Sequence, residues 1–367
     1  MGQPSISGER EFIASLRQLL AGSHTKAPGR QGVGSRSSSP VTLGVGDDCA
    51  ILRPPSGNEV LVTTDFTLET VHFRRKWHTP ESVGHRCLAR GLSDLAAMGA
   101  KPLAAFLSIA LPPELVRSHS GRAPWRDRFF DGFLFLADRY SVPLAGGDTA
   151  QSPGAVAKKP RNQPSRTASG LALMDIVLLG TAPSGRALRR SSAKAGDRIY
   201  VTGYLGGAAA ELELLSKNPR RFRNATAAGA DTAITNPHPH LFPEPRLAVG
   251  AWLLQNRRAS AAIDISDGLS TDLDHLCEES GLAATIDASA IPIHPIAQGT
   301  SGAEVARRFE FALHGGEDYE LLFTASPKVH VPRRIAGLPI TCIGEMRAGK
   351  PRRSRIVLRE MFAGQKR

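Results

Sequence analysis

Hydrophobic and polar residues recur at helical or strand-like spacing along most of the chain. Apolar positions three and four residues apart follow Ser7, which can cap a helix, and predict a first helix over residues 7–20. Thr79 can cap a second helix through its hydroxyl group. Pro80, which follows it, suits the first position of that helix. We expect further helices over residues 80–99, 125–140, 208–215, 246–255 and 269–279, and strands over residues 61–64, 104–111, 142–145, 171–179, 198–202, 261–265 and 320–324.

Helices and strands alternate in both halves of the chain, which favours an α/β plus α+β architecture over a helix bundle or a β-sandwich. A stretch with Pro, Gly and a cationic run follows Gly180 and is typical of a linker. We therefore expect two domains, residues 1–185 and 186–367. Composition rich in Ser, Gly, Lys and Arg predicts flexible loops at residues 24–40 and 152–169 and a basic tail at residues 347–367.

The composition excludes several classes of protein. The chain has 367 residues, of which 41% are hydrophobic and 22% charged, enough to build large apolar cores. No run approaches the roughly 18 apolar residues that a membrane span requires. The four cysteines lie far apart in the sequence and predict neither a disulfide framework nor a zinc site. The first residues lack the features of a signal peptide, so we expect a cytoplasmic protein with no membrane partner.

The net charge of +12 raises the question of nucleic-acid binding. Nineteen cations and a single acid lie in four tracts, residues 24–40, 155–166, 217–223 and 347–367, so the rest of the chain is net negative. These tracts are rich in Pro, Gly and Ser and lack interleaved aromatic residues. Solvated loops and tails explain this composition better than a nucleic-acid site does. A basic module that binds RNA or an acidic partner stays open as an alternative.

Acidic residues beside Gly, Ser or Thr recur at the expected ends of strands and starts of helices. They lie at five places, residues 44–48, 63–65, 93–94, 146–149 and 264–268. Mg²⁺ prefers oxygen ligands and is usually held by one or two carboxylates together with substrate phosphates. Glycine lets backbone amides approach phosphate oxygens. The recurrence therefore predicts a site for a metal-bridged polyphosphate, although each motif alone is also common in turns.

Asp94 differs from the other acids because its helical neighbours are apolar, where an Asp is unfavourable for both propensity and burial. It is either a hydrogen-bonded core acid or a metal ligand. The sequence contains no P-loop, no protein-kinase motif set and no dinucleotide-binding fingerprint. We interpret the Gly-rich turn at residues 202–207 as structural. We interpret His238 and His240 as part of a Pro-rich loop and not as a metal site.

Eight blocks in a fixed order carry a resemblance to a known family. They are GVGDDCA (44–50), TTD (63–65), HF (72–73), LSDLAAMGA (92–100), GGDT (146–149), RRSSAKAGD (189–197), DISDGL (264–269) and GGEDYELLF (315–323). Over residues 41–344 the chain resembles the thiamine-monophosphate kinase family, which shares a superfamily with aminoimidazole-ribonucleotide synthetase and selenophosphate synthetase. The resemblance implies an N-terminal α/β domain that dimerises, an α+β C-terminal domain of the aminoimidazole-ribonucleotide-synthetase type, and a homodimer.

The resemblance also implies substrates, a metal and site residues. The reaction would be the ATP-dependent phosphorylation of thiamine phosphate to thiamine diphosphate, with several Mg²⁺ ions and without a nucleic-acid partner. The implied Mg²⁺ ligands are Asp48, Thr63, Thr64, Asp65, Asp94, Asp148, Asp264 and Asp267. The implied ATP contacts are Phe130, Gly147, Asp148, Arg190 and Ser266, and the implied thiamine-phosphate contacts are His72 and Glu317. The tail from Met361 lacks the family's usual Gly-aromatic-x-His-Phe ending, so no aromatic substrate contact is assigned.

The implied reaction needs no catalytic base. The second pKa of a phosphate monoester is about 6, so the acceptor oxygen is largely ionised at neutral pH. We expect direct, in-line transfer in which metal ions and positioning carry the catalysis. The alternative within the superfamily is another ATP-dependent synthetase or small-molecule phosphotransferase with a different acceptor.

Overall fold

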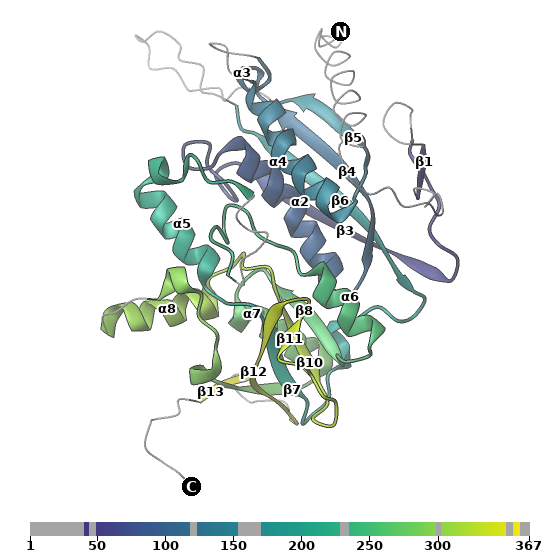
Figure 1. The fold of residues 1–367 in the computed structure, drawn as a ribbon, viewed down its shortest axis with the longest axis vertical. Helices are drawn as coiled ribbons and strands as arrows, with labels where there is room; N and C mark the ends of the chain where they lie inside the picture. The colour runs from purple at the N-terminus through teal and green to yellow at the C-terminus, as the bar shows by residue number, and fades with distance from the viewer. Residues whose placement is uncertain are drawn as a thin grey trace, which may run out of the picture.

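Two β-sheets with one long helix between them organise the chain (Figure 1). This computed structural model describes residues 40–43, 49–117, 123–152, 170–227, 235–298, 302–349 and 355–359. Asp48, the expected first helix and nearly all of the two expected loops lie outside the described residues. The expected mixture of helices and strands in both halves is confirmed. No helix within these ranges is long and apolar enough to cross a membrane.

The first sheet has four strands in the order β3-β6-β4-β5. They are β3 (Asn58–Leu68), β6 (Leu173–Pro183), β4 (Lys101–Leu111) and β5 (Leu144–Gln151), and only the pair β4 and β5 is parallel. Side chains alternate between two faces along each strand. The inner face, which includes Leu61, Ile176 and Leu107, is buried under helices α2 (Pro80–Ala97) and α4 (Trp125–Tyr140). A short helix α3 (Pro113–Val116) and a hairpin of β1 (Val41–Leu43) with β2 (Ile51–Leu52) lie beside this layer.

The outer face of the same sheet carries exposed apolar side chains on β3. Val62 is 63% exposed and Phe66 is 59% exposed. The strand register aligns Val62 with Leu179 and places Val177 beside Phe106, so these side chains form one continuous surface. Exposed apolar patches of this kind mark interaction sites.

Helices α2 and α4 lie against each other at backbone distance. Thr79 accepts a hydrogen bond from the Ser82 amide, and Pro80 occupies the first turn of α2, as the sequence predicts. A Cβ atom on Gly132 of α4 would lie 1.9 Å from the Glu81 carbonyl oxygen, and a Cβ on Gly84 of α2 would lie 1.9 Å from that of Phe129. Only glycine permits this approach.

The second sheet has seven strands, with β13-β9-β12-β7-β10-β8 as its main order and β11 paired to β12. The strands are β7 (Arg198–Thr202), β8 (Ala261–Ile265), β9 (Ala283–Asp287), β10 (Glu320–Ala325), β11 (Arg334–Ile335), β12 (Leu338–Arg347) and β13 (Ile356–Arg359). The helices are α5 (Gly207–Lys217), α6 (Leu247–Gln255), α7 (Leu269–Ser280) and α8 (Gly302–His314), with short 3₁₀ turns η1 (Arg190–Ser192), η2 (Pro219–Phe222), η4 (Ala288–Ala290) and η5 (Pro295–Ala297). One apolar core extends from the first sheet across α2 to Phe323 of β10, and a second core lies under α7.

Two sequence expectations about strand ends are wrong. The strand expected at residues 61–64 extends over Asn58–Leu68, so Asp65 lies inside a strand. The strand expected at residues 142–145 is β5, which continues through Gly146, Gly147 and Asp148. Gly147 stays in the strand because its backbone packs against Leu107, where a Cβ would lie 1.9 Å from the Leu107 carbonyl oxygen. A Gly-Gly-Asp motif is therefore not a turn in this chain.

Candidate functional site

Helix α2 carries a row of charged residues along one face. Arg86, Arg90 and Asp94 follow each other at intervals of four residues, so each lies about 6 Å from the next along the helix axis. Arg86 contacts Glu317 and Asp94 contacts Thr63. The helix therefore has a cationic end beside the loop that follows α8 and an acidic end beside β3.

At the acidic end, Asp94 meets residues on the inner face of β3. The Thr63 hydroxyl donates a hydrogen bond of 2.5 Å to Asp94 Oδ2. Asp65 Oδ1 lies 3.4 Å from Arg90 Nη2. Burial raises the pKa of Asp65, Arg90 opposes this effect, and the charge of Asp94 adds to it. Burial also raises the pKa of Asp94, against the Thr63 hydrogen bond and the charge of Arg190.

Asp264, at the end of β8, adds a third carboxylate from the second sheet. Its Oδ2 accepts a hydrogen bond of 2.7 Å from Ser93 of α2. Burial, followed by the charge of Asp94, raises the pKa of Asp264 to about 7, while Ser93 and Arg190 oppose the shift. We call Asp65, Asp94 and Asp264 the acid cluster. Electrostatic coupling among them means that a cation nearby stabilises their ionised forms.

The loop after β8 is held beside the acid cluster by one carboxylate. Asp272 Oδ2 accepts hydrogen bonds from the amides of Ser266, Asp267 and Gly268, at 3.0, 3.0 and 3.1 Å. Burial raises the pKa of Asp272 to about 6, although these bonds favour the ionised form. Sequence reasoning missed this role of Asp272, for which its place in the first turn of α7 was the available signal.

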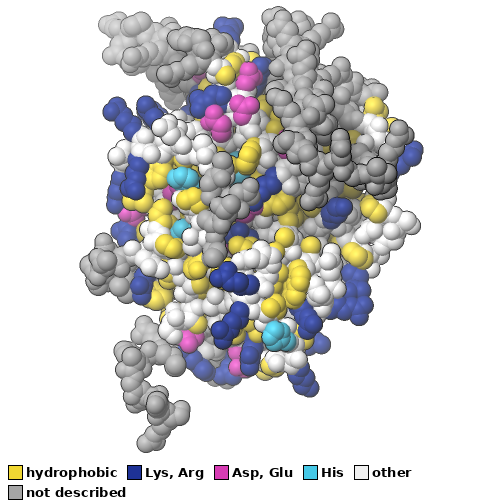
Figure 2. All heavy atoms as spheres, viewed as in Figure 1, with side chains coloured by type: hydrophobic (Ala, Val, Ile, Leu, Met, Phe, Trp, Pro, Cys, Tyr) yellow, Lys and Arg dark blue, Asp and Glu magenta, His cyan; other side chains and the backbone are white. Residues whose placement is uncertain are grey.

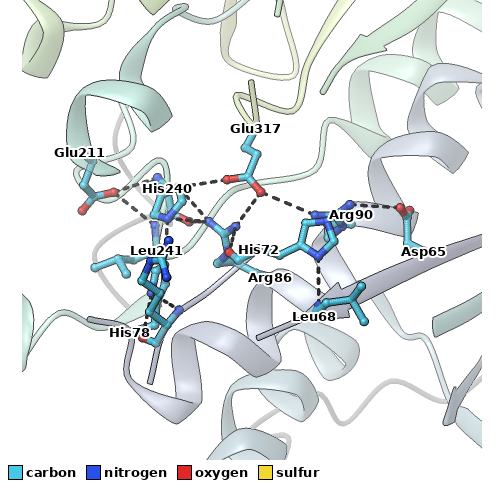
Figure 3. Close-up of polar contacts among 11 residues, drawn as sticks. Asp65, Leu68, His72, His78, Arg86, Arg90, Glu211, His240, Leu241 and Glu317 are labelled. Atoms are coloured by element: carbon cyan, nitrogen blue, oxygen red, sulfur yellow. Dashed lines mark hydrogen bonds and ion pairs between the residues drawn. The ribbon is translucent and has the colours of Figure 1, made fainter. Parts of the chain in front are cut away.

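At the cationic end, Glu317 is fixed by two side chains from different parts of the chain (Figure 3). Its Oε1 accepts from Arg86 Nη2 at 2.7 Å, and its Oε2 lies 3.2 Å from His240 Nδ1. Burial would raise the pKa of Glu317, but Arg86 and His240 outweigh it and hold the pKa well below its usual range. Glu317 has φ +68°, and strained backbone of this kind is typical of functional sites. Its amide donates to the Ser266 carbonyl at 2.8 Å, which joins the two loops.

A pair of buried histidines extends this contact. His78 Nε2 and His240 Nε2 are 2.9 Å apart, and burial lowers the pKa of both rings. Arg86 Nη1 lies 2.9 Å from His240 Nδ1 and 3.0 Å from its Nε2, so this arginine contacts both the ring and Glu317. Residues 238–240 do lie in a loop, and no three His, Cys, Asp or Glu side chains among the described residues could share a metal ion. No local pattern predicts that His240 lies against Glu317, because the contact joins segments far apart in the chain.

His72 lies beside Arg86 and Arg90 of α2 (Figure 3). Its Nδ1 accepts a hydrogen bond of 3.0 Å from the Leu68 amide. Burial, with the charge of Arg90, lowers the pKa of His72 to about 4, so the neutral ring carries its proton on Nε2. Nε2 is therefore a hydrogen-bond donor.

The structure does not bring every expected site residue together. Thr64 lies on the outer face of β3, and Asp148 lies on the same outer face of β5. Three strand spacings, about 14 Å, separate these two strands. Phe130 is 2% exposed and packs edge-on against Phe129 and Phe133, so its ring has no open face for a nucleotide.

The donors of the acid cluster fit Mg²⁺ by their chemistry. Carboxylate and hydroxyl oxygens are hard ligands, and burial raises the pKa of all three acids, to which the charge of Asp94 adds at Asp65 and Asp264. The described residues form no ready-made cage of three acids. This arrangement suits ions that share their coordination with substrate phosphates.

Comparisons with known proteins agree on one family. Residues 46–179 match the family model described as AIR synthase related protein, N-terminal domain. A thiamine-monophosphate kinase of Escherichia coli (strain K12) is 38% identical over 313 residues, 84% of this chain and 85% of that protein. The crystal structure of thiamine-monophosphate kinase from Stenotrophomonas maltophilia K279a matches with a TM-score of 0.70 and 31% identity, over 94% of this chain and 95% of that one. A structure titled AaThiL complexed with AMPPCP and TMP matches with a TM-score of 0.64 and 25% identity, over 98% and 95%.

Proposed function

This chain belongs to the thiamine-monophosphate kinase family, and we propose that it converts ATP and thiamine phosphate to ADP and thiamine diphosphate by direct in-line transfer. The observation that carries the mechanism is the order of groups along α2. A cluster of acids at one end suits metal-bound polyphosphate, and a fixed carboxylate at the other end suits a cationic organic group.

The transfer forms one bond and breaks another. A phosphate oxygen of thiamine phosphate attacks the γ-phosphorus of ATP, and the bond from that phosphorus to the β–γ bridging oxygen breaks with its electron pair on ADP. The acceptor oxygen is already ionised at neutral pH, so no side chain has to remove a proton. The protein supplies alignment and charge compensation.

The acid cluster, with Thr63, would hold Mg²⁺. Bound there, the metal would offset the charge on the nucleotide phosphates and on the group in transfer. Ser266 and Asp267 lie on the loop that Asp272 fixes, and Arg190 acts on the pKa of both Asp94 and Asp264. We assign these three residues to the nucleotide and metal side of the site.

Glu317 and His72 form the acceptor side. The thiazolium ring of thiamine phosphate is cationic, and Glu317 remains ionised because its pKa is held low. His72 Nε2 offers one hydrogen-bond donor close to the same place. These two groups suit the organic part of the acceptor and leave its phosphate directed towards the acid cluster.

The outer face of the first sheet supports a homodimer. Val62 and Phe66 are more than half exposed, and a second copy of the chain would bury this apolar surface. Thr64 and Asp148 share that face, so they would lie at the interface and not in the interior of one protomer. This placement accounts for their separation from the acid cluster.

The surface does not favour the nucleic-acid alternative. On the face seen in Figure 2, the Lys and Arg side chains of the described residues lie both at the rim and across the middle, and they form no single stripe there. Binding to a nucleic-acid backbone requires a continuous cationic path.

The test of the proposed function is stoichiometric. Incubation of the protein with Mg-ATP and thiamine phosphate should give ADP and thiamine diphosphate in equal amounts, and removal of Mg²⁺ by a chelator should stop both. Asp65→Asn should abolish most turnover, because it removes a carboxylate from the acid cluster. ADP formed without thiamine diphosphate would point to a different acceptor.

A further inference from the structure

Arg90 lies halfway between the two ends of the site (Figure 3). Along α2 it follows Arg86 by one turn and precedes Asp94 by one turn. Its guanidinium reaches Asp65 Oδ1 at 3.4 Å and Glu317 Oε1 at 3.6 Å. The cation therefore lies between the side chain proposed for the thiazolium end and a carboxylate proposed for the metal.

The hydrogen-bonding capacity of this guanidinium is mostly unused. Arginine presents five N–H donors in a rigid fork. Both carboxylate contacts are longer than the 2.7–2.9 Å of a charge-assisted hydrogen bond. Within the described part of the chain, the buried Nε has no hydrogen-bond partner. Arg86, by contrast, forms a close ion pair of 2.7 Å with the same Glu317 oxygen.

A half-buried arginine whose buried Nε has no hydrogen-bond partner among the described residues calls for an oxyanion. Leaving a desolvated donor without a partner costs about 1–3 kcal/mol, so such a group is usually satisfied in the working state of a protein. A planar fork matches the oxygens of a phosphate, to which it can donate two bonds at once. In the reaction proposed above, the phosphate of thiamine phosphate has to lie between the acid cluster and Glu317.

We infer that Arg90 is a catalytic residue that binds the phosphate group of thiamine phosphate and holds its attacking oxygen towards the nucleotide. This inference rests on the proposed function. Arg90 donates hydrogen bonds and takes up no proton, and its positive charge reduces repulsion between the acceptor phosphate and the polyphosphate. The phosphate oxygens would also accept hydrogen bonds from the Arg90 N–H groups that the long carboxylate contacts do not satisfy.

The test compares two ligands that differ only in the phosphate. Calorimetric titrations with thiamine phosphate and with thiamine are made on the parent, Arg90→Met, Arg90→Lys and the control Arg347→Met. Arg347 is an exposed arginine at the end of β12. We expect Arg90→Met to lower affinity for thiamine phosphate by about 10- to 100-fold, the range of a charge-assisted contact, and to leave thiamine within twofold. Arg90→Lys keeps the charge and loses the fork, so it should fall between the two.

Kinetics give a second readout. With Mg-ATP in excess, Arg90→Met should lower kcat/KM for thiamine phosphate by at least tenfold and leave the KM for ATP within about twofold. A purely structural role would weaken both ligands alike, and that result would overturn the inference. Unchanged binding of thiamine phosphate would overturn it as well. If Arg90→Met does not fold, the Arg90→Lys titration alone decides, since a structural ion pair would leave the ratio of the two ligand affinities as in the parent.

The outcome for the proposed function is read separately. A parent protein that binds thiamine phosphate but forms no thiamine diphosphate would contradict the proposed reaction. The titrations would still test whether Arg90 binds the phosphate group. A parent that makes thiamine diphosphate, with an Arg90→Met variant of equal activity, would contradict only the role of Arg90. A parent that binds neither ligand would overturn both.

Discussion

Asp94 is an acidic side chain in an otherwise apolar stretch of helix, and its surroundings suggest a reason. It accepts a hydrogen bond from Thr63 and raises the pKa of both Asp65 and Asp264. A core acid selected for stability would gain from its neighbours. Here Arg190 and Arg90 favour the ionised form of Asp94, whereas burial and the charge of Asp94 itself disfavour ionisation of Asp65 and Asp264.

Removing this charge should therefore separate stability from function. We expect Asp94→Asn without metal to be as stable as the parent or more stable, and to lose turnover. Mg-nucleotide should raise the melting temperature of the parent much more than that of the variant, because a ligand that binds only the native state stabilises by mass action. Thermal melts of both proteins, with Asp131→Asn on the exposed face of α4 as the control, measure this. Equal shifts in parent and variant would remove Asp94 from the metal site.

His85 predicts an effect of pH on stability. The ring is buried, its Nε2 lies 2.8 Å from the Pro243 carbonyl oxygen, and burial lowers its pKa to about 4. The unfolded ring takes up a proton near pH 6.5, so the unfolded state binds more protons between pH 6.5 and pH 4. The contribution of His85 to the free energy of unfolding is therefore fully present above about pH 6.5 and is lost as the pH falls towards 4.

The corresponding variant should be less sensitive to acid. Between pH 8 and pH 5, the free energy of unfolding of the parent should fall by about 2 kcal/mol more than that of His85→Gln. Urea titrations at the two pH values give this difference, in which the opposing contributions of the buried carboxylates cancel. Parallel losses in both proteins would show that His85 does not titrate as its burial requires.

Among single residues, the sequence could point only to those whose chemistry conflicts with that of their neighbours in the chain. Asp94 could be singled out because an acid in an apolar helix needs an explanation. Glu317 and His72 came only from the family resemblance, since nothing near them in the sequence distinguishes them. Arg86 and His240 were missed because their contact with Glu317 joins segments more than seventy residues apart, which no local pattern encodes.

At the scale of elements, the ends of helices were predicted better than the ends of strands. Thr79 and Pro80 mark the start of α2 by local chemistry, and the expected helix from Trp125 to Tyr140 is confirmed as α4. A strand ends where its partner ends, so β3 extends beyond its predicted limits along β6. β5 likewise runs through Gly147 because it pairs with β4.

The packing of α2 on α4 gives a prediction for these elements. Gly132→Ala places a methyl group where the Glu81 carbonyl oxygen lies, so the two helices must move apart. We expect a loss of about 1–3 kcal/mol in the free energy of unfolding, the usual cost of overpacking. Chemical denaturation measures it, and Asp131→Ala, one residue away on the exposed side of α4, should change stability by less than about 0.5 kcal/mol. A stable Gly132→Ala protein would contradict the backbone contact.

At the scale of the whole molecule, the open face of the first sheet predicts association. The parent should sediment as a dimer, and Val62→Glu should shift it towards the monomer, because an interfacial carboxylate would be desolvated without a partner. Val357→Glu provides the matched control, since Val357 is 55% exposed on β13 of the other sheet. A monomeric parent, or equal behaviour of the two variants, would rule out this face as the interface.

Helix α2 also determines how the enzyme can move. It is joined to the second half of the chain at three successive levels, by the ion pair of Arg86 with Glu317, the hydrogen bond of Ser93 with Asp264, and the close approach of Ala96 to Gly250 of α6. A hinge motion that separated the two sheets would have to break all three contacts. Such an opening would separate polar groups that now satisfy one another in the ion pair and in the hydrogen bond. We therefore expect substrates to enter and products to leave without separation of the two sheets.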